Sequence, residues 1–296
     1  MKEFAASLIV RLAHWLAKLE LRSLQRLGAA IGDLIWWLQL KPARITRTNL
    51  NFCYPRATPD QCRDLGRRSM QDTVRTIVEA GAIWEWPLER SLALVREVEG
   101  EELIRESLEK GRGVIVLGPH LGNWELTGLY LASKFRMASL YRPPRLQGLE
   151  NYMRKARSRS GAELVPTTNK GVARLLAILR DGGVVGILPD QVPPKESSDF
   201  APFFGLETST MTLASRLSAR TGASVLCAYA LRLPNAQGFR LIIKPADGVE
   251  APDLKSSLTA LNRCVEEGIS LEPSQYQWEY RRFKRRPKGL PRIYYE

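Results

Sequence analysis

The spacing of apolar residues over positions 4 to 40 predicts an amphipathic helical segment. Leucine and tryptophan side chains recur on one side and basic side chains flank them: the N-terminal stripe is Leu8, Leu12, Trp15, Leu16 and Leu19, and its flank is Arg11, Lys18, Arg22 and Arg26. A membrane-spanning helix needs about 20 mostly uncharged residues, so these charges argue against one. Two interpretations stay open: a helix packed on the protein's own core, or one lying in a membrane interface. Trp15, Trp36 and Trp37, as interfacial anchors, favour the membrane.

From residue 59 onward the pattern predicts a long helix and then an alternation of short apolar strands with helices. The expected helices are 59–84, 100–110, 123–134, 146–160, 170–181, 208–221 and 253–271, and the expected strands are 113–118, 137–141, 163–165, 184–188, 224–232 and 239–245. Such an alternation is typical of an α/β fold, a central mostly parallel sheet flanked by helices, with an antiparallel pair near the end. We expect residues 1–42 to form a membrane-associating helical segment and residues 43–296 one α/β domain.

The most informative chemistry lies where the first of these strands ends. His120 follows the apolar run 114–117 and the breaker pair Gly118-Pro119, and Glu125 comes five residues later at the start of a helix. Ligands bind in open α/β sheets beyond the carboxyl ends of strands, so this strand-to-helix loop is a candidate site. His120 is a candidate general base, and Glu125 a candidate partner that fixes its tautomer. The alternative is an ordinary loop histidine beside a glutamate favoured by the helix dipole.

Two proline-rich loops follow other strand ends at the same predicted edge. Arg142 comes after strand 137–141, and Asp190 after strand 184–188. If the strands are parallel, both side chains converge on His120 and Glu125. Charged residues in such loops usually only cap strands, so each is weak by itself, but three loops at one edge favour a shared site.

Composition narrows the class of partner and argues against a metal centre. The chain has 296 residues with 44 Lys+Arg against 31 Asp+Glu, a net charge of +13 that favours anionic partners such as lipid, nucleic acid or acidic proteins. Its four cysteines form no paired Cys-x-x-Cys motif, and its two histidines lie far apart in the sequence. We therefore expect neither a disulfide framework nor a metal, and no cofactor.

Four blocks of residues carry a resemblance to a known family. They are 118–125 (GPHLGNWE), 140–143 (LYRP), 188–191 (LPDQ) with 203–205 (FFG), and 277–283 (QWEYRRF), in order along nearly the whole chain. With these blocks the sequence resembles the late, lauroyl- and myristoyl-type acyltransferases of lipid A biosynthesis, which act on the Kdo-modified lipid A precursor.

This resemblance implies a glycerol-3-phosphate-acyltransferase-like α/β fold and an acyltransferase at the cytoplasmic face of the inner membrane. The implied acyl donor is acyl carrier protein, the acceptor is a hydroxyl of the lipid A precursor, and anionic membrane lipid is a third partner. His120 and Glu125 would be catalytic. The substrate-binding residues would be Asn123, Arg142, Asp190, Gln191, Arg281 and Arg282, with Arg142 steadying an acceptor phosphate or the developing oxyanion.

Two rival functions remain. The run 278–292 carries seven basic residues interleaved with Trp278, Tyr280 and Phe283, as in a single-stranded nucleic-acid surface. That rival leaves the His120 loop unexplained, so we expect no nucleic-acid partner. The second rival is an acyltransferase acting on a smaller acceptor, a lysophospholipid or an ornithine lipid.

Overall fold

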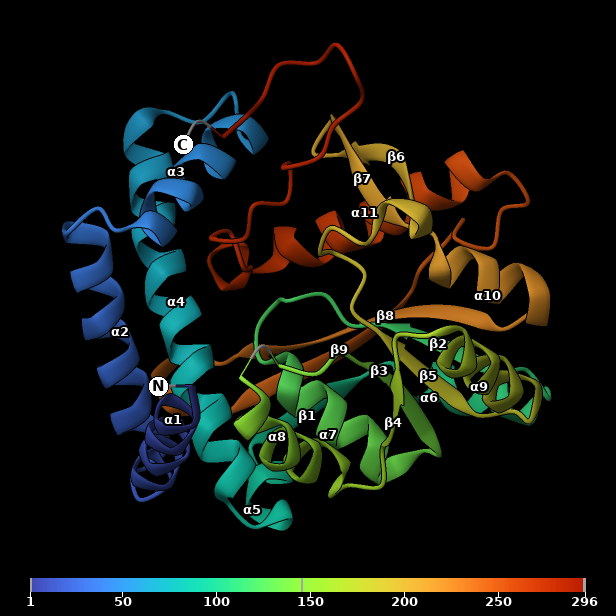
Figure 1. The fold of residues 1–296 in the computed structure, drawn as a ribbon, viewed down its shortest axis with the longest axis horizontal. Helices are drawn as coiled ribbons and strands as arrows, with labels where there is room; N and C mark the ends of the chain where they lie inside the picture. The colour runs from blue at the N-terminus through green and yellow to red at the C-terminus, as the bar shows by residue number, and fades with distance from the viewer. Residues whose placement is uncertain (1, 145, 295–296) are drawn as a thin grey trace.

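The computed structural model describes residues 2–144 and 146–294, which fold around a central sheet of seven strands (Figure 1). The strand order is β1-β9-β8-β2-β5-β3-β4, in which only the β8–β9 pair is antiparallel. The strands are β1 (Val95–Glu99), β2 (Val114–Leu117), β3 (Met137–Tyr141), β4 (Glu163–Pro166), β5 (Val184–Ile187), β8 (Ser224–Arg232) and β9 (Phe239–Pro245). The expected mostly parallel α/β fold with a late antiparallel pair is confirmed.

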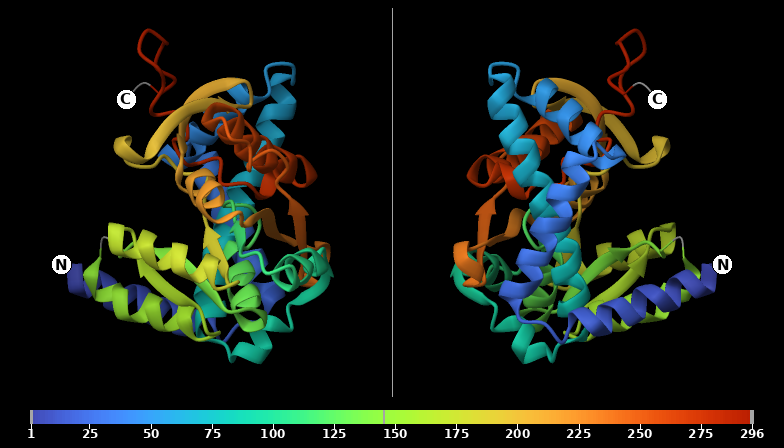
Figure 2. Two further views of the ribbon diagram at one scale, coloured as in Figure 1. Left: turned by 90° about the vertical axis from the view of Figure 1, so that its right-hand side faces the viewer. Right: turned by 90° about the vertical axis from the view of Figure 1, so that its left-hand side faces the viewer.

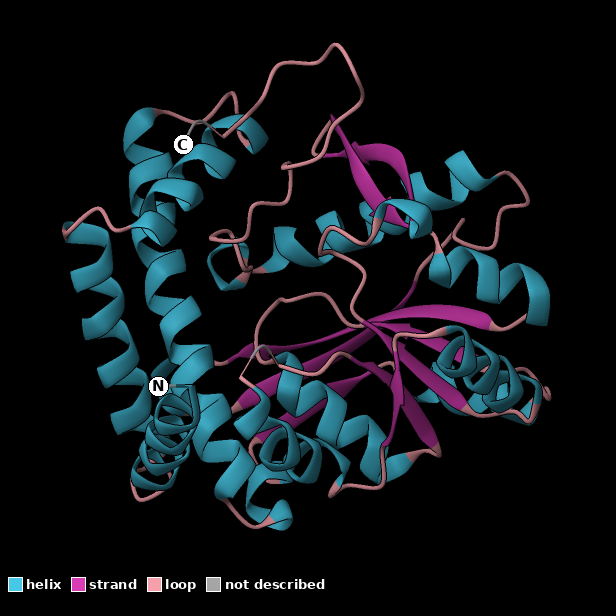
Figure 3. Ribbon diagram, in the orientation of Figure 1, coloured by secondary structure: helices cyan, strands magenta, loops and turns pink. Residues whose placement is uncertain are grey.

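Helices cover both faces of this sheet (Figure 3). They are α1 (Lys2–Leu16), α2 (Leu21–Trp37), α3 (Lys41–Cys53), α4 (Pro59–Glu85), α5 (Leu88–Leu92), α6 (Glu101–Glu109), α7 (Trp124–Lys134), α8 (Glu150–Ser158), α9 (Asn169–Arg180), α10 (Leu213–Thr221) and α11 (Leu254–Leu271). One core cluster joins the sheet to α9, α10 and α11, and a second joins it to α4, α6 and α7. Every residue of β2 and β5 is buried because both faces are covered, which explains their continuous apolar runs.

Helices α2 and α4 pack at unusually short range, and glycine permits it. A Cβ added at Gly28 or Gly32 of α2 would lie 2.6 or 2.5 Å from the α-carbon of Arg75 or Gln71 on α4. A Cβ at Gly66 of α4 would lie 2.4 Å from the Trp36 ring. Trp36 is therefore buried, 7% exposed, against α4. The prediction that Trp36 anchors the protein in a membrane interface is wrong, because its ring fills the gap that Gly66 leaves.

The N-terminal stripe divides between the core and the surface. Leu16 is 5% exposed and packs with α4 in the second core cluster, and Leu19 lies against the same cluster. Leu8, Leu12 and Trp15 are about half exposed. Figure 2 shows α1 at the lower edge of the molecule, beside the turn at Gln147–Leu149 that it contacts. One side of the stripe therefore packs on the protein's own core, as the first interpretation expects, and the other side faces outward.

Three further differences from the predicted elements have local causes. Residues 208–211 were expected to begin a helix but lie in strand β7 (Leu206–Met211), paired antiparallel with β6 (Ser198–Phe203) in a separate two-stranded sheet. Alternating threonine and serine suits that strand better than a helix, and the helix begins later, as α10. The polar strand β1 and the helix α3 were not predicted, because neither has a strong apolar pattern. Across the described residues, no helix combines the length and apolar character needed to cross a membrane.

Candidate active site

The loop between β2 and α7, residues 118–123, holds the candidate base and is fixed along its backbone. The Gly118 and Asn123 amides donate to Ile187 O and Ala230 O, at 2.9 and 2.8 Å. Gly122 has φ of +61°, and a Cβ there would lie 2.1 Å from Ala230 O. Only glycine fits this close approach, so the chain can turn against β8 and present His120 beyond the carboxyl end of β2, as predicted.

Asp190 holds the imidazole of His120 at two points. Its Oδ1 lies 2.8 Å from His120 Nδ1, and its Oδ2 accepts the His120 backbone amide at 3.0 Å. The carboxylate is almost fully buried, which by itself raises its pKa. The charge and hydrogen bonds of His120 outweigh that effect, so the pKa of Asp190 is lowered. A carboxylate accepting from Nδ1–H leaves Nε2 as the lone-pair nitrogen, the form that a general base needs.

The Nε2 side of the imidazole faces two glutamines. The Gln191 amide nitrogen lies 3.2 Å from His120 Nε2 and also donates to Gln277 Oε1 at 3.2 Å. The Gln277 backbone amide donates to His120 O at 3.1 Å. The Gln191 amide is therefore the group beside Nε2, between His120 and Gln277.

Glu125 does not share a hydrogen bond with His120. Its carboxylate, 8% exposed, forms an ion pair with Arg157 of α8, whose Nε lies 3.0 Å from Oε2, and it accepts from the Trp84 indole at 3.2 Å. Burial lowers the pKa of Arg157, but Glu125 outweighs it and the pKa is raised. The neighbouring Trp124 ring packs against His120, with the two ring centroids 4.9 Å apart. The tautomer-fixing position expected for Glu125 is thus held by Asp190.

Asn123 faces away from His120, into a buried network of charges. Its Oδ1 caps α7 by accepting from Leu126 N at 3.0 Å, and its Nδ2 donates to Glu79 at 3.2 Å. Glu79 in turn forms two 2.7 Å hydrogen bonds with Arg232, which also contacts Asp72 at 3.1 Å. Asn123 is 0% exposed. These contacts give Asn123 a supporting position behind the loop rather than the expected contact with substrate.

The three predicted arginines occupy different settings. Arg142 is exposed just after β3, whose carboxyl end lies at the same edge as that of β2. Arg281 is partly buried on the C-terminal segment, residues 276–294. Arg282 is 2% exposed, and its guanidinium donates to Ser209 O at 2.6 Å and to Thr210 and Asn262. Arg282 therefore ties β7 to α11, a structural position that differs from the predicted substrate contact.

The sequence analysis did not identify Arg157, Trp84 or the contact between Gln277 and Gln191. Arg157 is one of four basic residues in α8 and its neighbours, so composition gave no reason to select it. Trp84 lies 41 positions before Glu125 and pairs with it only in the folded chain. Gln277 stands at the head of the block 277–283, and that position was its only signal. Within the described residues, no cluster of three or more His, Cys, Asp or Glu side chains could hold a metal ion.

Comparisons with known proteins identify the family of the chain. The model of the bacterial lipid A biosynthesis acyltransferase family matches residues 1–285. The lipid A biosynthesis lauroyltransferase of Escherichia coli (strain K12) is 30% identical over 274 residues, covering 91% of this chain and 88% of that protein. The palmitoleoyltransferase of the same organism is 29% identical, with 90% and 87% covered, and its myristoyltransferase is 26% identical, with 64% and 59% covered.

A strand-to-helix loop that presents a carboxylate-held imidazole at the edge of an α/β sheet, together with this similarity, defines the class. The chain belongs to the bacterial lipid A biosynthesis acyltransferase family, and it is an acyltransferase.

Proposed function

We propose that the protein transfers a fatty acyl chain from acyl carrier protein to a hydroxyl on a primary acyl chain of the lipid A precursor. The observation that carries this proposal is the imidazole of His120, held at Nδ1 by Asp190 with its Nε2 beside the Gln191 amide. The names of the relatives supply the acceptor class. The net charge of +13 suits all three anionic partners: the carrier protein, the phosphorylated acceptor and the membrane.

In the proposed mechanism His120 is the general base. The acceptor hydroxyl displaces the Gln191 amide from Nε2 and attacks the thioester carbonyl while Nε2 takes its proton. The carbon–sulfur bond then breaks, and the imidazolium returns that proton to the leaving thiolate. Asp190 stabilises the imidazolium and keeps Nδ1 protonated throughout.

Two further groups have proposed roles at the same edge. Glu125 keeps its place in the proposed catalytic pair, but through Arg157: the carboxylate holds the guanidinium at the end of α7 nearest His120. A guanidinium there can stabilise negative charge that develops on the thioester oxygen. Arg142, exposed at the end of β3, is proposed to steady the same oxyanion or an acceptor phosphate.

We also propose that the protein works at the cytoplasmic face of the inner membrane. Exposed apolar side chains gather on α1 and α2: Phe4, Leu8 and Leu12 are 74%, 57% and 51% exposed, and Leu34 and Trp37 are 52% and 76% exposed. Side chains of this size are normally buried, and with basic residues around them they suit an interfacial contact. The buried half of the N-terminal stripe ties this surface to the acyltransferase domain.

The nucleic-acid rival loses its main support in the structure. Trp278 and Phe283, which would have to stack on bases, are 1% and 2% exposed inside the core. We expect no gel shift with single-stranded nucleic acid.

Replacing the base tests the proposal directly. In purified protein, His120→Ala should lower turnover by about a hundredfold to ten-thousandfold, the usual range for loss of a general base. His14→Ala is a matched control, because His14 is the other histidine of the chain and contacts Glu85 on the surface. Acyl carrier protein carrying the acyl chain should serve as donor, with the lipid A precursor as acceptor.

Two results would contradict the proposal. Wild-type turnover by folded His120→Ala protein would remove the imidazole from the mechanism. Faster acylation of a lysophospholipid or an ornithine lipid than of the lipid A precursor would favour the smaller-acceptor alternative.

A further inference from the structure

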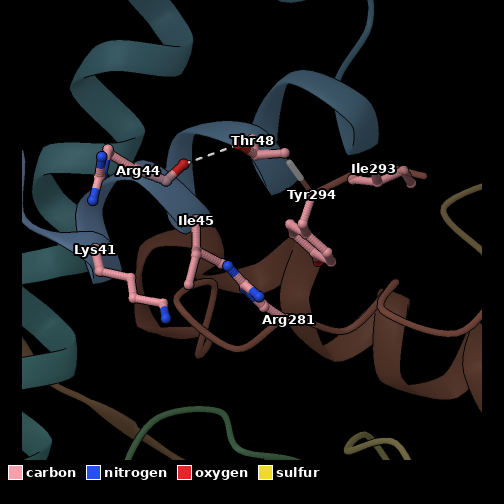
Figure 4. Close-up of a pocket in the computed structure, with 7 residues that line it drawn as sticks. All are labelled: Lys41, Arg44, Ile45, Thr48, Arg281, Ile293 and Tyr294. Atoms are coloured by element: carbon pink, nitrogen blue, oxygen red, sulfur yellow. Dashed lines mark hydrogen bonds between the residues drawn. The ribbon is translucent and has the colours of Figure 1, made fainter. Parts of the chain in front are cut away.

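A cationic pocket of about 440 Å³ lies between α3 and the C-terminal segment (Figure 4). Helix α3 contributes Lys41, Arg44, Ile45 and Thr48, and the C-terminal segment contributes Arg281, Ile293 and Tyr294. Its volume falls in the range of small-ligand sites. We call it the α3 pocket; it is lined by different residues from those that surround His120.

The α3 pocket is built by one buried residue that holds its two walls together. Asn49, 1% exposed, donates to Trp278 O at 2.6 Å and to Tyr280 O at 2.9 Å, and it accepts from the Tyr294 hydroxyl. Arg281 comes directly after Tyr280 in the chain, so its backbone is held close to Asn49. Its guanidinium lies 5.5 Å from the centroid of the Tyr294 ring. The pocket is therefore a fixed part of the fold, because its walls share hydrogen bonds on both sides of Arg281.

In the part of the chain that the structure describes, no acidic side chain neutralises the charges of the α3 pocket. Among residues 2–144 and 146–294, no carboxylate lines the pocket, and Lys41, Arg44 and Arg281 take part in no ion pair. Arg281 Nε is also buried with no hydrogen-bond partner in that part of the chain. Burying a charged donor without an acceptor is costly, so this arrangement calls for an anion with several oxygens.

The surroundings of the pocket indicate that this anion belongs to a lipid. Trp37, Leu38 and Leu40 immediately precede Lys41 and are 76%, 49% and 44% exposed. A free anion gains nothing from exposed apolar side chains next to Lys41 in the chain, whereas a lipid offers acyl chains beside its phosphate. We propose that the α3 pocket binds a phosphate group of the acceptor glycolipid, with Arg281 as its bidentate partner and Lys41 and Arg44 as flanking cations. This inference rests on the proposed function for the identity of that lipid.

Equilibrium binding separates this proposal from catalysis. The probes are the detergent-dispersed lipid A precursor, the same lipid treated with phosphatase, and inorganic phosphate alone. Arg281→Gln and Arg44→Gln should each weaken binding of the phosphorylated lipid by roughly tenfold or more, as for loss of a hydrogen bond to a charged group. Arg47→Gln is a matched control, because it removes the same charge from the same helix at an exposed residue that lies over Trp36 instead.

Each outcome bears on one part of the proposal. Wild-type protein that binds both lipids equally, or a loss with Arg47→Gln as large as with Arg281→Gln, would overturn the phosphate site. Inorganic phosphate bound as tightly as the lipid would overturn the lipid source. His120→Ala protein should still bind the phosphorylated lipid; normal turnover by that variant would defeat the proposed mechanism while leaving the α3 pocket intact. Arg44→Gln keeps the test valid if Arg281→Gln fails to fold, because Arg44 is exposed.

Discussion

The loop of residues 118–123 has two sides that use charge in opposite ways. Behind it, the buried side chains of Asp72 and Glu79 of α4 and Arg232 of β8 form ion pairs, and the partly buried Arg75 of α4 pairs with Asp72. In front of it, among the residues that the structure describes, His120 contacts Asp190 through one ring nitrogen and only the Gln191 amide through the other. Every ionised group behind the loop has a charged partner, whereas in front one nitrogen keeps only a weak, displaceable contact.

This difference distinguishes residues that hold the loop in place from residues with a proposed catalytic role. A buried charge that is fully paired fixes the position of the backbone, and Asn123 passes that constraint from Glu79 to the loop. The proposed general base, His120, must keep a lone pair accessible, so the front side cannot be satisfied to the same degree. Variants behind the loop should therefore change stability, and variants in front of it should change turnover.

The largest expected effect is on the front side, at Asp190. Asp190→Asn should lower kcat by about a hundredfold to ten-thousandfold, because an amide can donate to Nδ1 and so favour the wrong tautomer. Glu125→Gln should lower kcat less than Asp190→Asn does, because Glu125 bonds to Arg157 and not to His120. Steady-state kinetics on both purified variants checks this. Equal losses at unchanged stability would mean that Glu125 acts on His120 as closely as Asp190 does.

Behind the loop, Arg232→Met should destabilise the protein by about 3–5 kcal/mol, because it leaves the fully buried Glu79 without its partner. Arg240→Met is the matched control on the neighbouring strand. Its pair with Glu99 is exposed, at 3.7 Å, and should contribute about 1 kcal/mol or less. Urea unfolding measures both. A loss of turnover in folded Arg232→Met at unchanged stability would mean that the back side takes part in the chemistry.

A smaller effect is expected on membrane binding. Helices α1 and α2 pack on α4, which lies behind the loop, and their exposed apolar side chains are the proposed membrane contact. Replacing Leu8, Leu12 and Trp37 together by Gln should weaken binding to anionic vesicles by at least about tenfold, because exposed apolar area no longer enters the interface. Leu271→Gln is the control, at a 40% exposed leucine of α11. Cosedimentation checks this. Unchanged binding of the triple variant would move the contact to the basic residues of 281–292.

The smallest effect concerns Glu279, a carboxyl that accepts from Thr73 at 3.0 Å near the front side. Burial raises the pKa of Glu279. A raised folded-state pKa stabilises the fold below the unfolded value of about 4.3, and that contribution is lost as pH rises through the folded pKa. Glu279→Gln should therefore be slightly more stable than wild type at pH 7, with the difference fading below about pH 4. Thermal unfolding against pH checks this, and a constant difference across pH would contradict it.

The lowered pKa of Asp190 affects stability in the opposite direction. Its contribution to stability is present above about pH 3.9, the unfolded value, and is lost as pH falls through the lower folded value. The stability difference between Asp190→Asn and wild type should therefore disappear in acid, where protonation removes an ion pair from the wild type. The difference between Glu279→Gln and wild type also disappears in acid, but there protonation removes a penalty from the wild type.

How much the sequence could predict depended on the range of each interaction. Periodicity located β2, β5 and α7, and with them the loop that carries His120, because these patterns depend on neighbouring residues. Asp190 was placed at the correct edge because parallel strands bring their carboxyl ends together. The partner of Glu125 could not be found this way. Arg157 reaches it from another helix, and only side-chain packing decides which of two nearby carboxylates, Asp190 or Glu125, meets the imidazole.

Burial was similarly hard to predict for Trp36 and Trp37. The two adjacent tryptophans have the same chemistry, and the sequence offered no reason to separate them. The absent side chain of Gly66, on another helix, decides that Trp36 points inward and Trp37 outward.

The close packing of α2 on α4 connects the proposed membrane surface to the loop that carries His120. With no side chains between them at Gly28 and Gly32, the helices lack the compliance that would let one rock against the other. Helix α4 also carries Glu79, which is bonded to the loop of His120 through Asn123. The exposed apolar side chains of α1 and α2 and the His120 loop are thus joined through the packing and hydrogen bonds of α4. On the proposed membrane contact, the His120 imidazole would lie at a fixed distance from the membrane surface, so the depth of that contact would set which substrate atoms reach the imidazole.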